Sequence, residues 1–510
     1  MNEEAAPRLG RGMWKRFGLA AVLVIVLTAA ATATAGLLEF SSFVDDISPK
    51  GSKINAKVDP VKPGAPQTIL VIGSDRRFKD RRDVHNARSD TIILLRLDAD
   101  ATVTTVMSIP RDLKVRLRRR GGRIQTDKIN AAYSIGGPDF TARTVRSLLS
   151  WRGQSFRINH IVNVNFGGFK AAVDFLGCVY TDVDRRYFND NSQAGPGEDY
   201  ATINLKPGYQ RLCGQDALDY VRFRHADTDI VRSARQQDFL RQAKGQYGTG
   251  QLVSDRHRLA RIFGRFTQSD SQLHSVKALL ELMTLAISTA SSPIREVHFP
   301  AVFPKDARDP YLTARASGIR RAVEQFLAAS TAASKPATRR PSRRKGRRRA
   351  PKLVPGAVPG LVNATSAGQQ QGVMLGAGAG MPVYYPKLLT SGGSYAPAIS
   401  GIYPRPYQIH DRQRRAHAAY RLTVKVNDEL GNYYGIQGTT WKNPPLLAHP
   451  SETRVVGGRR LQLYFDGPRL RLVAWRHGRG VYWISNTLQE LVPNQQMLGI
   501  AASFTRLGGR

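Results

Sequence analysis

Cysteine and acidic residues are both scarce in this sequence. Only two cysteines, Cys178 and Cys213, occur in 510 residues. This number excludes a disulfide-rich scaffold, and the absence of a C-x-x-C pair excludes a zinc ribbon. The 39 acidic residues stand against 76 lysines and arginines, so the formal net charge is +37. Such a charge indicates polyanionic surroundings, which would be nucleic acid, anionic lipid or an anionic wall polymer.

Three common catalytic motifs are also missing. The sequence contains no G-x-x-x-x-G-K-[ST], no H-E-x-x-H and no G-x-S-x-G. Nucleotide hydrolysis by a P-loop and hydrolysis by a zinc or serine enzyme therefore have no support from motifs.

One long stretch lacks charge altogether. Residues 17–38 are 22 consecutive uncharged residues, most of them apolar, enough to cross a bilayer as a helix. Basic residues precede this stretch and acidic residues follow it. The positive-inside rule then predicts a single-pass protein of the cell membrane with a cytoplasmic N-terminus and an extracellular remainder. A cleaved signal peptide with a small-residue site at 33–35 is the alternative, and it would export the chain as well.

Three apolar runs predict strands in the first folded unit. Residues 68–73 form a continuous apolar run that ends in glycine, typical of a strand buried on both faces. Residues 91–97 and 102–109 predict a hairpin around an Asp-containing turn. In an antiparallel pair the start of one strand lies beside the end of the other, which would place Asp90 near Arg111. The end of the first strand, before Asp75, would join them if its neighbour runs in the right direction.

The remainder of this unit alternates strands with helices. A helical pattern from 128 to 151 is interrupted at Gly136-Gly137-Pro138. Further helices are predicted at 166–176 and 234–247, strands at 158–164, 179–183 and 201–205, and a mostly helical region with one strand (296–299) at 252–328. Such alternation over about 260 residues predicts an α/β or α+β domain with a central mixed sheet flanked by helices.

The stretch 222–237 concentrates arginine. The residues before it are predicted as a short strand or a helix end. As a strand, they would place Arg222 and Arg224 on one face, while Arg232, Arg235 and Gln236 share one face of a helix. Two such arginine pairs repel each other unless an anion lies between them, and arginine forks suit phosphate oxygens. The stretch therefore predicts a phosphate or diphosphate site, with a solvated basic face as the alternative.

Asp75 and Asp90 complement these arginines. Two carboxylates beside a diphosphate would hold Mg²⁺, which takes one or two carboxylates plus phosphate oxygens. The metal and the arginines would stabilise the charge on a leaving diphosphate while an acceptor hydroxyl attacks and a carboxylate takes its proton. Simple ion pairing of the two aspartates with Arg77 and Arg88 is the alternative.

The chain changes character after about residue 329. Residues 335–352 carry ten basic residues, and such a block is predicted to be disordered. Nucleic-acid binding is an alternative for this block, but the predicted topology places it outside the cell, so we expect no nucleic-acid partner. Beyond residue 371, strands at 422–426, 461–465, 470–475 and 481–484 and a helix at 494–504 predict a smaller α+β unit. Trp475 and Trp483 are predicted either as core residues or as a platform that stacks on carbohydrate.

Seven short motifs follow one another through residues 73–237. They are GSDRR (73–77), RSDT (88–91), SIPRD (108–112), KINAAYSIGG (128–137), VNFGGFKAAVDFLGCV (164–179), LCGQDALDYVRFRH (212–225) and DIVRSARQQ (229–237). In this order they resemble the LytR–CpsA–Psr (LCP) family of membrane-anchored enzymes of cell-envelope assembly. The resemblance implies transfer of a glycopolymer from a polyprenyl-diphosphate carrier to peptidoglycan, through a phosphodiester link and with help from Mg²⁺. The richness in arginine and alanine is typical of an actinobacterial chain.

The resemblance also implies roles for individual residues. Asp75 and Asp90 match the family's two metal-associated aspartates. The implied diphosphate ligands are Arg88, Arg111, Arg222, Arg224, Arg232, Arg235 and Gln236. The implied catalytic residues are Asp90, Arg111, Arg222, Arg224 and Arg232. The family's lipid tail lies in an apolar tunnel, which residues 145–149 and 166–176 would line.

The two cysteines depart from the family pattern together. Cys178 stands where many members have glycine, and Cys213 directly precedes Gly214. With an oxidising exterior, this paired departure predicts a Cys178–Cys213 disulfide, and two free buried thiols are the alternative.

The predicted organisation has six parts. They are a cytoplasmic tail (1–16), a transmembrane helix (17–38), a stalk (39–66), the LCP-type catalytic domain (67–328), a disordered basic linker (329–370) and an accessory α+β domain (371–510). Three other functions use the same observations: a polyprenyl-diphosphate pyrophosphatase with water as acceptor, a DNA-binding regulator, and a non-catalytic wall-binding protein.

Overall fold

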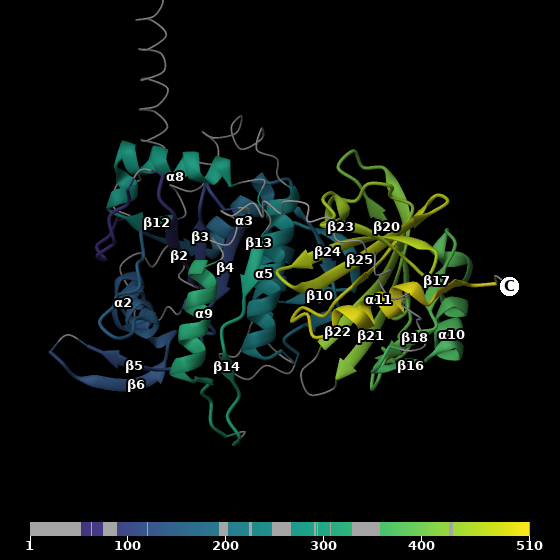
Figure 1. Cartoon of the computed structure of the whole chain (residues 1–510), viewed down its shortest axis with the longest axis horizontal. Coiled ribbons are helices and arrows are strands. Elements are labelled where there is room, and N and C mark those ends of the chain that lie inside the picture. The colour runs from purple at the N-terminus through teal and green to yellow at the C-terminus, as the bar shows by residue number, and fades with distance from the viewer. Residues whose placement is uncertain are drawn as a thin grey trace, which may run out of the picture.

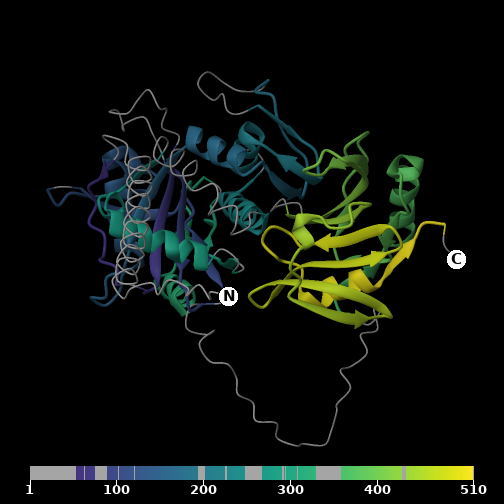
Figure 2. The same cartoon turned by 90° about the horizontal axis from the view of Figure 1, so that it is seen from above.

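The structure is a computed structural model with two folded units side by side (Figure 1, Figure 2). It describes residues 53–62, 64–74, 89–101, 103–119, 121–192, 202–223, 227–246, 267–289, 292, 294–306, 308–328, 358–427 and 432–508. Within these ranges, no helix combines the length and the apolar character needed to cross a membrane. The predicted anchor at 17–38 and the basic linker up to residue 357 lie outside the described residues.

A seven-stranded mixed sheet forms the centre of the N-terminal unit, with the order β1-β12-β7-β2-β3-β4-β13 (Figure 1). Its strands are β1 (Lys53–Ile54), β2 (Gln67–Ser74), β3 (Ser89–Leu97), β4 (Thr104–Ser108), β7 (His160–Asn165), β12 (Thr267–Asp270) and β13 (Ile294–Val297). The pairs β1–β12, β2–β7 and β4–β13 are parallel, and the other neighbours are antiparallel. The predicted mixed sheet and the hairpin of β3 with β4 are therefore confirmed.

Helices cover both faces of this sheet. They are α2 (Ala131–Leu149), α3 (Phe166–Phe175), α4 (Gly214–Arg222), α5 (Asp229–Gln246), α8 (Val276–Ser288) and α9 (Ala316–Ala328). Because side chains alternate along a strand, Leu70 of β2 packs with residues of α2 and α9, whereas its neighbour Ile69 packs with Leu285 of α8. The interruption predicted in α2 is confirmed, since Gly136 and Gly137 have non-helical backbone angles.

Four short antiparallel strand pairs complete the N-terminal unit. They are β5 (Lys114–Arg118) with β6 (Ile124–Lys128), β8 (Val179–Val183) with β11 (Gly208–Leu212), β9 (Tyr187–Asn189) with β10 (Ile203–Leu205), and β14 (Ala301–Val302) with β15 (Thr313–Ala314). The helical pattern predicted from residue 128 begins too early, because Lys128 ends β6 and α2 begins at Ala131. Strand β12 lies in the region predicted to be mostly helical, and it pairs with β1 and β7.

The C-terminal unit is built on an eight-stranded sheet, β19-β21-β22-β26-β25-β24-β23 with β20 paired to β21. Its strands are β19 (Ser394–Tyr395), β20 (Arg405–His410), β21 (Ala416–Asn427), β22 (Asn432–Thr439), β23 (Glu452–Val456), β24 (Arg459–Asp466), β25 (Arg469–His477) and β26 (Gly480–Ser485). Around it lie β16 (Leu361–Asn363), α10 (Thr365–Leu375), β17 (Tyr384–Pro386), β18 (Leu388–Thr390), α11 (Asn494–Ala502) and β27 (Phe504–Arg506). The four predicted strands and the closing helix are confirmed.

The predicted linker extends too far. Strand β16 and the start of α10 fall within residues assigned to the linker, because β16 pairs with β18 and its backbone is thereby ordered. Trp475 and Trp483 are 1% and 0% exposed. Both are core residues, and the alternative of an exposed carbohydrate platform is wrong.

The two units share a hydrophobic core. Tyr180 of β8 and Tyr209 of β11 belong to one buried cluster with Trp483 and other residues of the C-terminal sheet. The Tyr180 hydroxyl donates to the His410 carbonyl at 2.8 Å, and the backbone N–H of Leu446 donates to the Tyr209 hydroxyl at 3.2 Å. The β8–β11 hairpin is therefore the platform on which the C-terminal unit docks.

Candidate active site

Several polar segments converge at one edge of the central sheet. The end of β2 pairs with the start of β3, since Ser74 lies opposite Ser89. The end of β4 is at the same edge, because the Ile109 N–H donates to the Ile92 carbonyl. The parallel strand β7 also ends there, with Asn165 opposite Ser74. The topology thus confirms the expectation that the ends of the first three predicted strands meet.

The backbone around Asp90 is irregular at this edge. Gly73 pairs with Thr91 and Ser74 pairs with Ser89, so the ladder skips Asp90 and forms a β-bulge there. Bulges re-aim a side chain and are common beside active sites. Of Asp90 only the backbone is described, and Asp75, Arg88 and Arg224 lie outside the described residues. Their assigned roles stay predictions.

Arg111 and Arg232 come together around one aspartate. Arg111 follows β4, and its Nε lies 3.6 Å from Oδ1 of Asp229, the first residue of α5. Arg232, one helical turn further on, forms an ion pair with the same Oδ1. All three side chains are at most 15% exposed. Asp229 therefore supplies part of the negative charge that the sequence requires between its arginines. Its i, i+3 spacing to Arg232 would have indicated this role.

Arg222 lies at the end of a helix and not on a strand. The alternative of a helix end is correct, because Ala217, Tyr220 and Val221 have the i, i+3, i+4 spacing of a buried helical face and are all buried. The Arg222 guanidinium lies 3.9 Å from the centre of the Phe166 ring at the start of α3. This contact brings the C-terminus of α4 to the edge where β7 ends.

Gln236 positions the end of α4. The Gln236 amide donates to the Val221 carbonyl at 3.1 Å and ties α5 to α4. Burial raises the pKa of the Asp219 carboxyl, while the Arg222 guanidinium acts in the opposite direction. Gln236 thus binds the backbone of α4 next to Arg222, at the candidate site.

Arg235 does not belong to a ligand site. Its side chain is 0% exposed and pairs with Asp227, and it donates to the Phe223 carbonyl at 2.6 Å. The Asp227 carboxylate also accepts a hydrogen bond from the Arg185 guanidinium at 2.5 Å. The prediction that Arg235 binds the diphosphate is wrong, because a phosphate in solvent cannot reach a guanidinium that the protein encloses.

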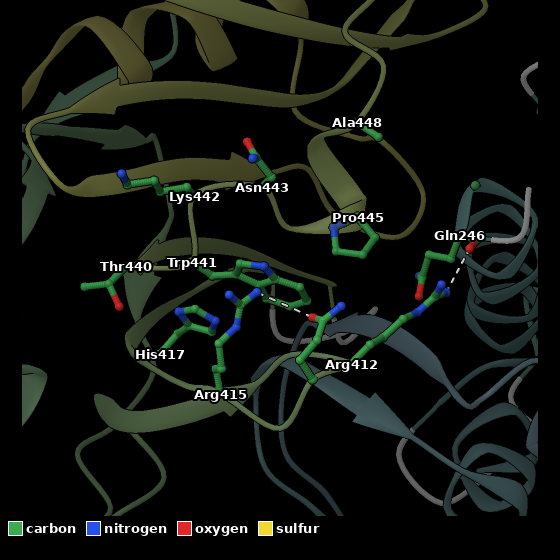
Figure 3. Close-up of a pocket in the computed structure, with 12 residues that line it drawn as sticks. Gln246, Arg412, Arg415, His417, Thr440, Trp441, Lys442, Asn443, Pro445 and Ala448 are labelled. Carbon is green, nitrogen blue, oxygen red and sulfur yellow. Dashed lines mark hydrogen bonds between the residues drawn. The ribbon is translucent and has the colours of Figure 1, made fainter.

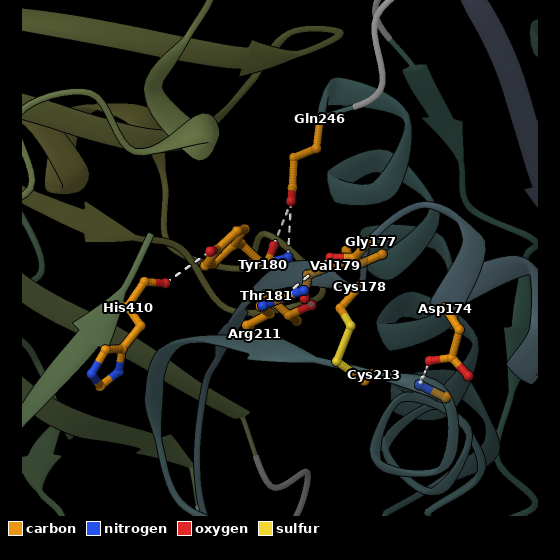
Figure 4. Close-up of a disulfide and its surroundings, with 11 residues drawn as sticks. Asp174, Gly177, Cys178, Val179, Tyr180, Thr181, Arg211, Cys213, Gln246 and His410 are labelled. Atoms are coloured by element: carbon orange, nitrogen blue, oxygen red, sulfur yellow. Dashed lines mark hydrogen bonds between the residues drawn. A yellow bond between two sulfur atoms is a disulfide. The ribbon is translucent and has the colours of Figure 1, made fainter. Parts of the chain in front are cut away.

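The Cys178–Cys213 disulfide is present in the structure and lies beside the docking platform (Figure 4). It connects the segment after α3 to the residue before α4, where the Gly214 N–H donates to the Asp174 carboxylate at 2.8 Å. Cys178 has a φ of 68°, in the left-handed region that favours glycine. This backbone conformation would suit a glycine, and the disulfide accounts for the cysteine.

We expect removal of this disulfide to destabilise the chain substantially. Cys178→Ser with Cys213→Ser opens a loop with a sequence separation of 35, and the free energy of unfolding should fall by about 3–4 kcal/mol. Urea unfolding of oxidised wild type and the double variant measures this. Cys178→Gly with Cys213→Ser is the matched control, and it should recover up to about 1 kcal/mol because glycine accepts the left-handed backbone. Equal stability of wild type and the double serine variant would contradict the role given to the bond.

The segments predicted to line a lipid tunnel lie in different clusters. Val145 and Leu149 of α2 are 0% exposed within the main core of the N-terminal unit. Phe169 and Val173 of α3 pack instead with Phe239 and other residues around α4 and α5. The prediction that these segments line a tunnel stays a prediction.

The edge of the sheet thus has the features of an anion-binding site. Arginines from the end of β4, the end of α4 and the first turn of α5 converge there. The LytR_cpsA_psr family model matches residues 40–312, more than half of the chain. This protein belongs to the LytR–CpsA–Psr family.

Two curated relatives are named polyisoprenyl-teichoic acid–peptidoglycan teichoic acid transferases. The chain is 30% identical over 220 residues to TagU of Oceanobacillus iheyensis, which covers 42% of this chain and 61% of the relative. It is 30% identical over 192 residues to TagT of Bacillus subtilis, covering 38% and 56%. The chain therefore matches little more than half the length of these relatives. A solved LytR-Csp2A-Psr enzyme from Actinomyces oris covers 55% of this chain and 96% of its own, with 20% identity and a TM-score of 0.41.

Proposed function

We propose that this protein transfers a glycopolymer from a polyprenyl-diphosphate carrier to peptidoglycan. The observation that carries the proposal is that Arg111 and Arg232 meet around Asp229, while Arg222 lies against Phe166 at the end of β7, all within the segment that matches the family model. Transferases among the relatives are named for lipid-linked teichoic acid and peptidoglycan. The donor class and the acceptor of this chain are inferred from that likeness.

The proposed reaction is a phosphoryl transfer. The oxygen of an acceptor hydroxyl attacks the phosphorus that carries the glycan, and the bond from this phosphorus to the bridging oxygen breaks. Polyprenyl monophosphate leaves, and the hydroxyl proton passes to a carboxylate, for which Asp90 is the candidate. Arg111, Arg222 and Arg232 act by stabilising negative charge on the phosphoryl group and on the departing phosphate.

Aspartates hold the arginines of this site in place. Asp229 pairs with both Arg111 and Arg232, and Asp112 lies 3.6 Å from the Arg111 Nε. Such fixed guanidiniums need no reorganisation when charge develops.

Magnesium and the membrane anchor are also part of the proposal. Asp75 and Asp90 would hold Mg²⁺, which supplies additional charge neutralisation at the diphosphate. The β-bulge at Asp90 and the pairing of Ser89 with Ser74, the residue before Asp75 in the sequence, support this assignment. Residues 17–38 would anchor the protein, with the described units on the extracellular side.

A direct assay tests the proposal. The full chain in detergent is incubated with a synthetic polyprenyl-diphosphate glycan, Mg²⁺ and peptidoglycan fragments, and mass spectrometry identifies the products. We use the full chain because the catalytic unit shares a core with the C-terminal unit. Glycan joined to peptidoglycan through phosphate is expected. Free polyprenyl monophosphate without a peptidoglycan adduct would reject the transferase in favour of a pyrophosphatase.

A further inference from the structure

A second pocket lies between the end of α5 and the C-terminal unit (Figure 3). Its volume is about 600 Å³, within the range of small-ligand sites. The residues that line it are Gly245, Gln246, Arg412, Gln413, Arg415, His417, Thr440, Trp441, Lys442, Asn443, Pro445 and Ala448. Gln246 comes from the same helix as Arg232 but fourteen residues later, which at 1.5 Å per residue is about 20 Å along the helix. The pocket is therefore separate from the candidate active site.

The charge of this pocket is positive. None of its described lining residues is acidic, whereas Arg412, Arg415 and Lys442 all line it. Asp411, just behind the lining, accepts from Arg415 at 2.8 Å and from His417 at 3.1 Å. Arg412 donates to the uncharged Gln246 carbonyl at 2.8 Å. The charges of Arg412 and Lys442 are thus not balanced by any ion pair among the described residues, and they favour an anionic ligand.

The remaining lining residues favour a polar, non-planar ligand. His417 stacks on Trp441 with the ring centroids 5.6 Å apart, and Trp441 also packs edge-on against Tyr180 at 5.0 Å. Little aromatic face is left for a flat base to stack on. Figure 3 shows the amide groups of Gln246 and Asn443 on opposite sides of the pocket. Amides and a hydroxyl such as that of Thr440 both donate and accept hydrogen bonds, as the hydroxyls of a sugar require.

We propose that this junction pocket binds an anionic saccharide, that is, a sugar that carries a phosphate or a carboxylate. Figure 3 shows Arg412 beside Gln246 and Lys442 on the opposite side of the pocket. Arg412 therefore contacts the anionic group, Lys442 adds to the positive charge of the pocket, and the amide side chains bind the sugar hydroxyls. The inference needs no transfer chemistry, since it concerns binding alone. The site exists only when both units are present, because α5 and the C-terminal unit each supply part of its wall.

Equilibrium binding to the full chain tests this site without Mg²⁺ or lipid carrier. The probes are N-acetylglucosamine 1-phosphate, N-acetylmuramic acid, neutral N-acetylglucosamine and inorganic phosphate, each measured by isothermal titration calorimetry. We expect at least one anionic sugar to bind about tenfold or more tightly than the neutral sugar. A preference for the phosphate sugar indicates a donor-like ligand, and a preference for the carboxylate sugar indicates an acceptor-like ligand. Inorganic phosphate binding as tightly as both anionic sugars would overturn the proposal.

Charge reversal locates the binding. Arg412→Glu with Lys442→Glu should weaken binding of the preferred sugar about tenfold or more. Both side chains are exposed, so the fold should survive, whereas Trp441 is unsuitable because it packs on the shared core. The matched control is Arg506→Glu on β27, which pairs with β17 and does not line the pocket, and it should leave the affinity within about twofold because salt screens distant charges. An equal loss in both variants would overturn the site.

Discussion

Asp182→Ala should lower the free energy of unfolding by about 3–5 kcal/mol. Asp182, in β8, accepts from Arg421 of the C-terminal unit at 2.7 Å and from the Trp483 indole at 3.2 Å. The side chains of Asp182 and Arg421 are 6% and 1% exposed. Removing the carboxylate leaves a buried guanidinium without its counter-ion, and such an orphan charge costs much more than the ion pair contributes.

Urea unfolding followed by tryptophan fluorescence measures this loss, because Trp483 is part of the contact. Asp182→Ala with Arg421→Met should be less destabilised than Asp182→Ala alone, since the second change removes the orphan charge. The matched control is Glu452→Ala, which breaks the exposed pair of Arg454 and Glu452 and should cost at most about 1 kcal/mol. If Asp182→Ala and Glu452→Ala proved equally stable, the units would not be held together by this contact.

Arg111→Ala should reduce transfer by about 10²–10³-fold with little change in stability. The effect on folding should be small because both acidic partners of Arg111 keep another ion pair. Asp229 keeps Arg232, and Asp112 keeps Lys128 at 2.9 Å, so no buried carboxylate is left unpaired. The large effect on activity follows if this guanidinium stabilises charge in the transition state, as the proposed function requires.

Arg235→Ala provides the contrasting variant from the same arginine-rich stretch. Its guanidinium lies against the rings of Tyr187 and Tyr220, 4.9 and 5.6 Å from their centres, and pairs with buried Asp227. Asp227 keeps Arg185, so the expected loss of about 2–4 kcal/mol in the free energy of unfolding comes from the cavity beside these rings and from the Phe223 carbonyl, which loses its donor. Rates of glycan transfer, corrected for folded protein, and unfolding curves are measured for both variants. Transfer by Arg111→Ala within about threefold of wild type would remove Arg111 from the site.

Much of the N-terminal unit follows from patterns within short windows. The apolar runs of β2 and β3, the turn before β4 and the helical face of α3 depend on neighbouring residues alone, so the sequence predicts them with nearly the observed bounds. The order of motifs likewise places Asp90 and Arg111 at one edge, because a hairpin joins β3 to β4. The i, i+3, i+4 spacing of apolar residues in α4 predicts a helix, but a segment of nine residues with tyrosine and valine fits a strand as well.

The roles of individual arginines depended on tertiary structure. Arg232 and Arg235 are three residues apart on one helix, yet Arg232 pairs with Asp229 near the sheet edge and Arg235 is enclosed with Asp227. Sequence spacing gives the face of a helix, whereas burial depends on which other elements pack there. The docking of Tyr209 against Trp483 joins residues that are far apart along the chain. Local periodicity therefore determined the elements of this protein, and long-range packing alone decided which charges are neutralised inside it and which face a ligand.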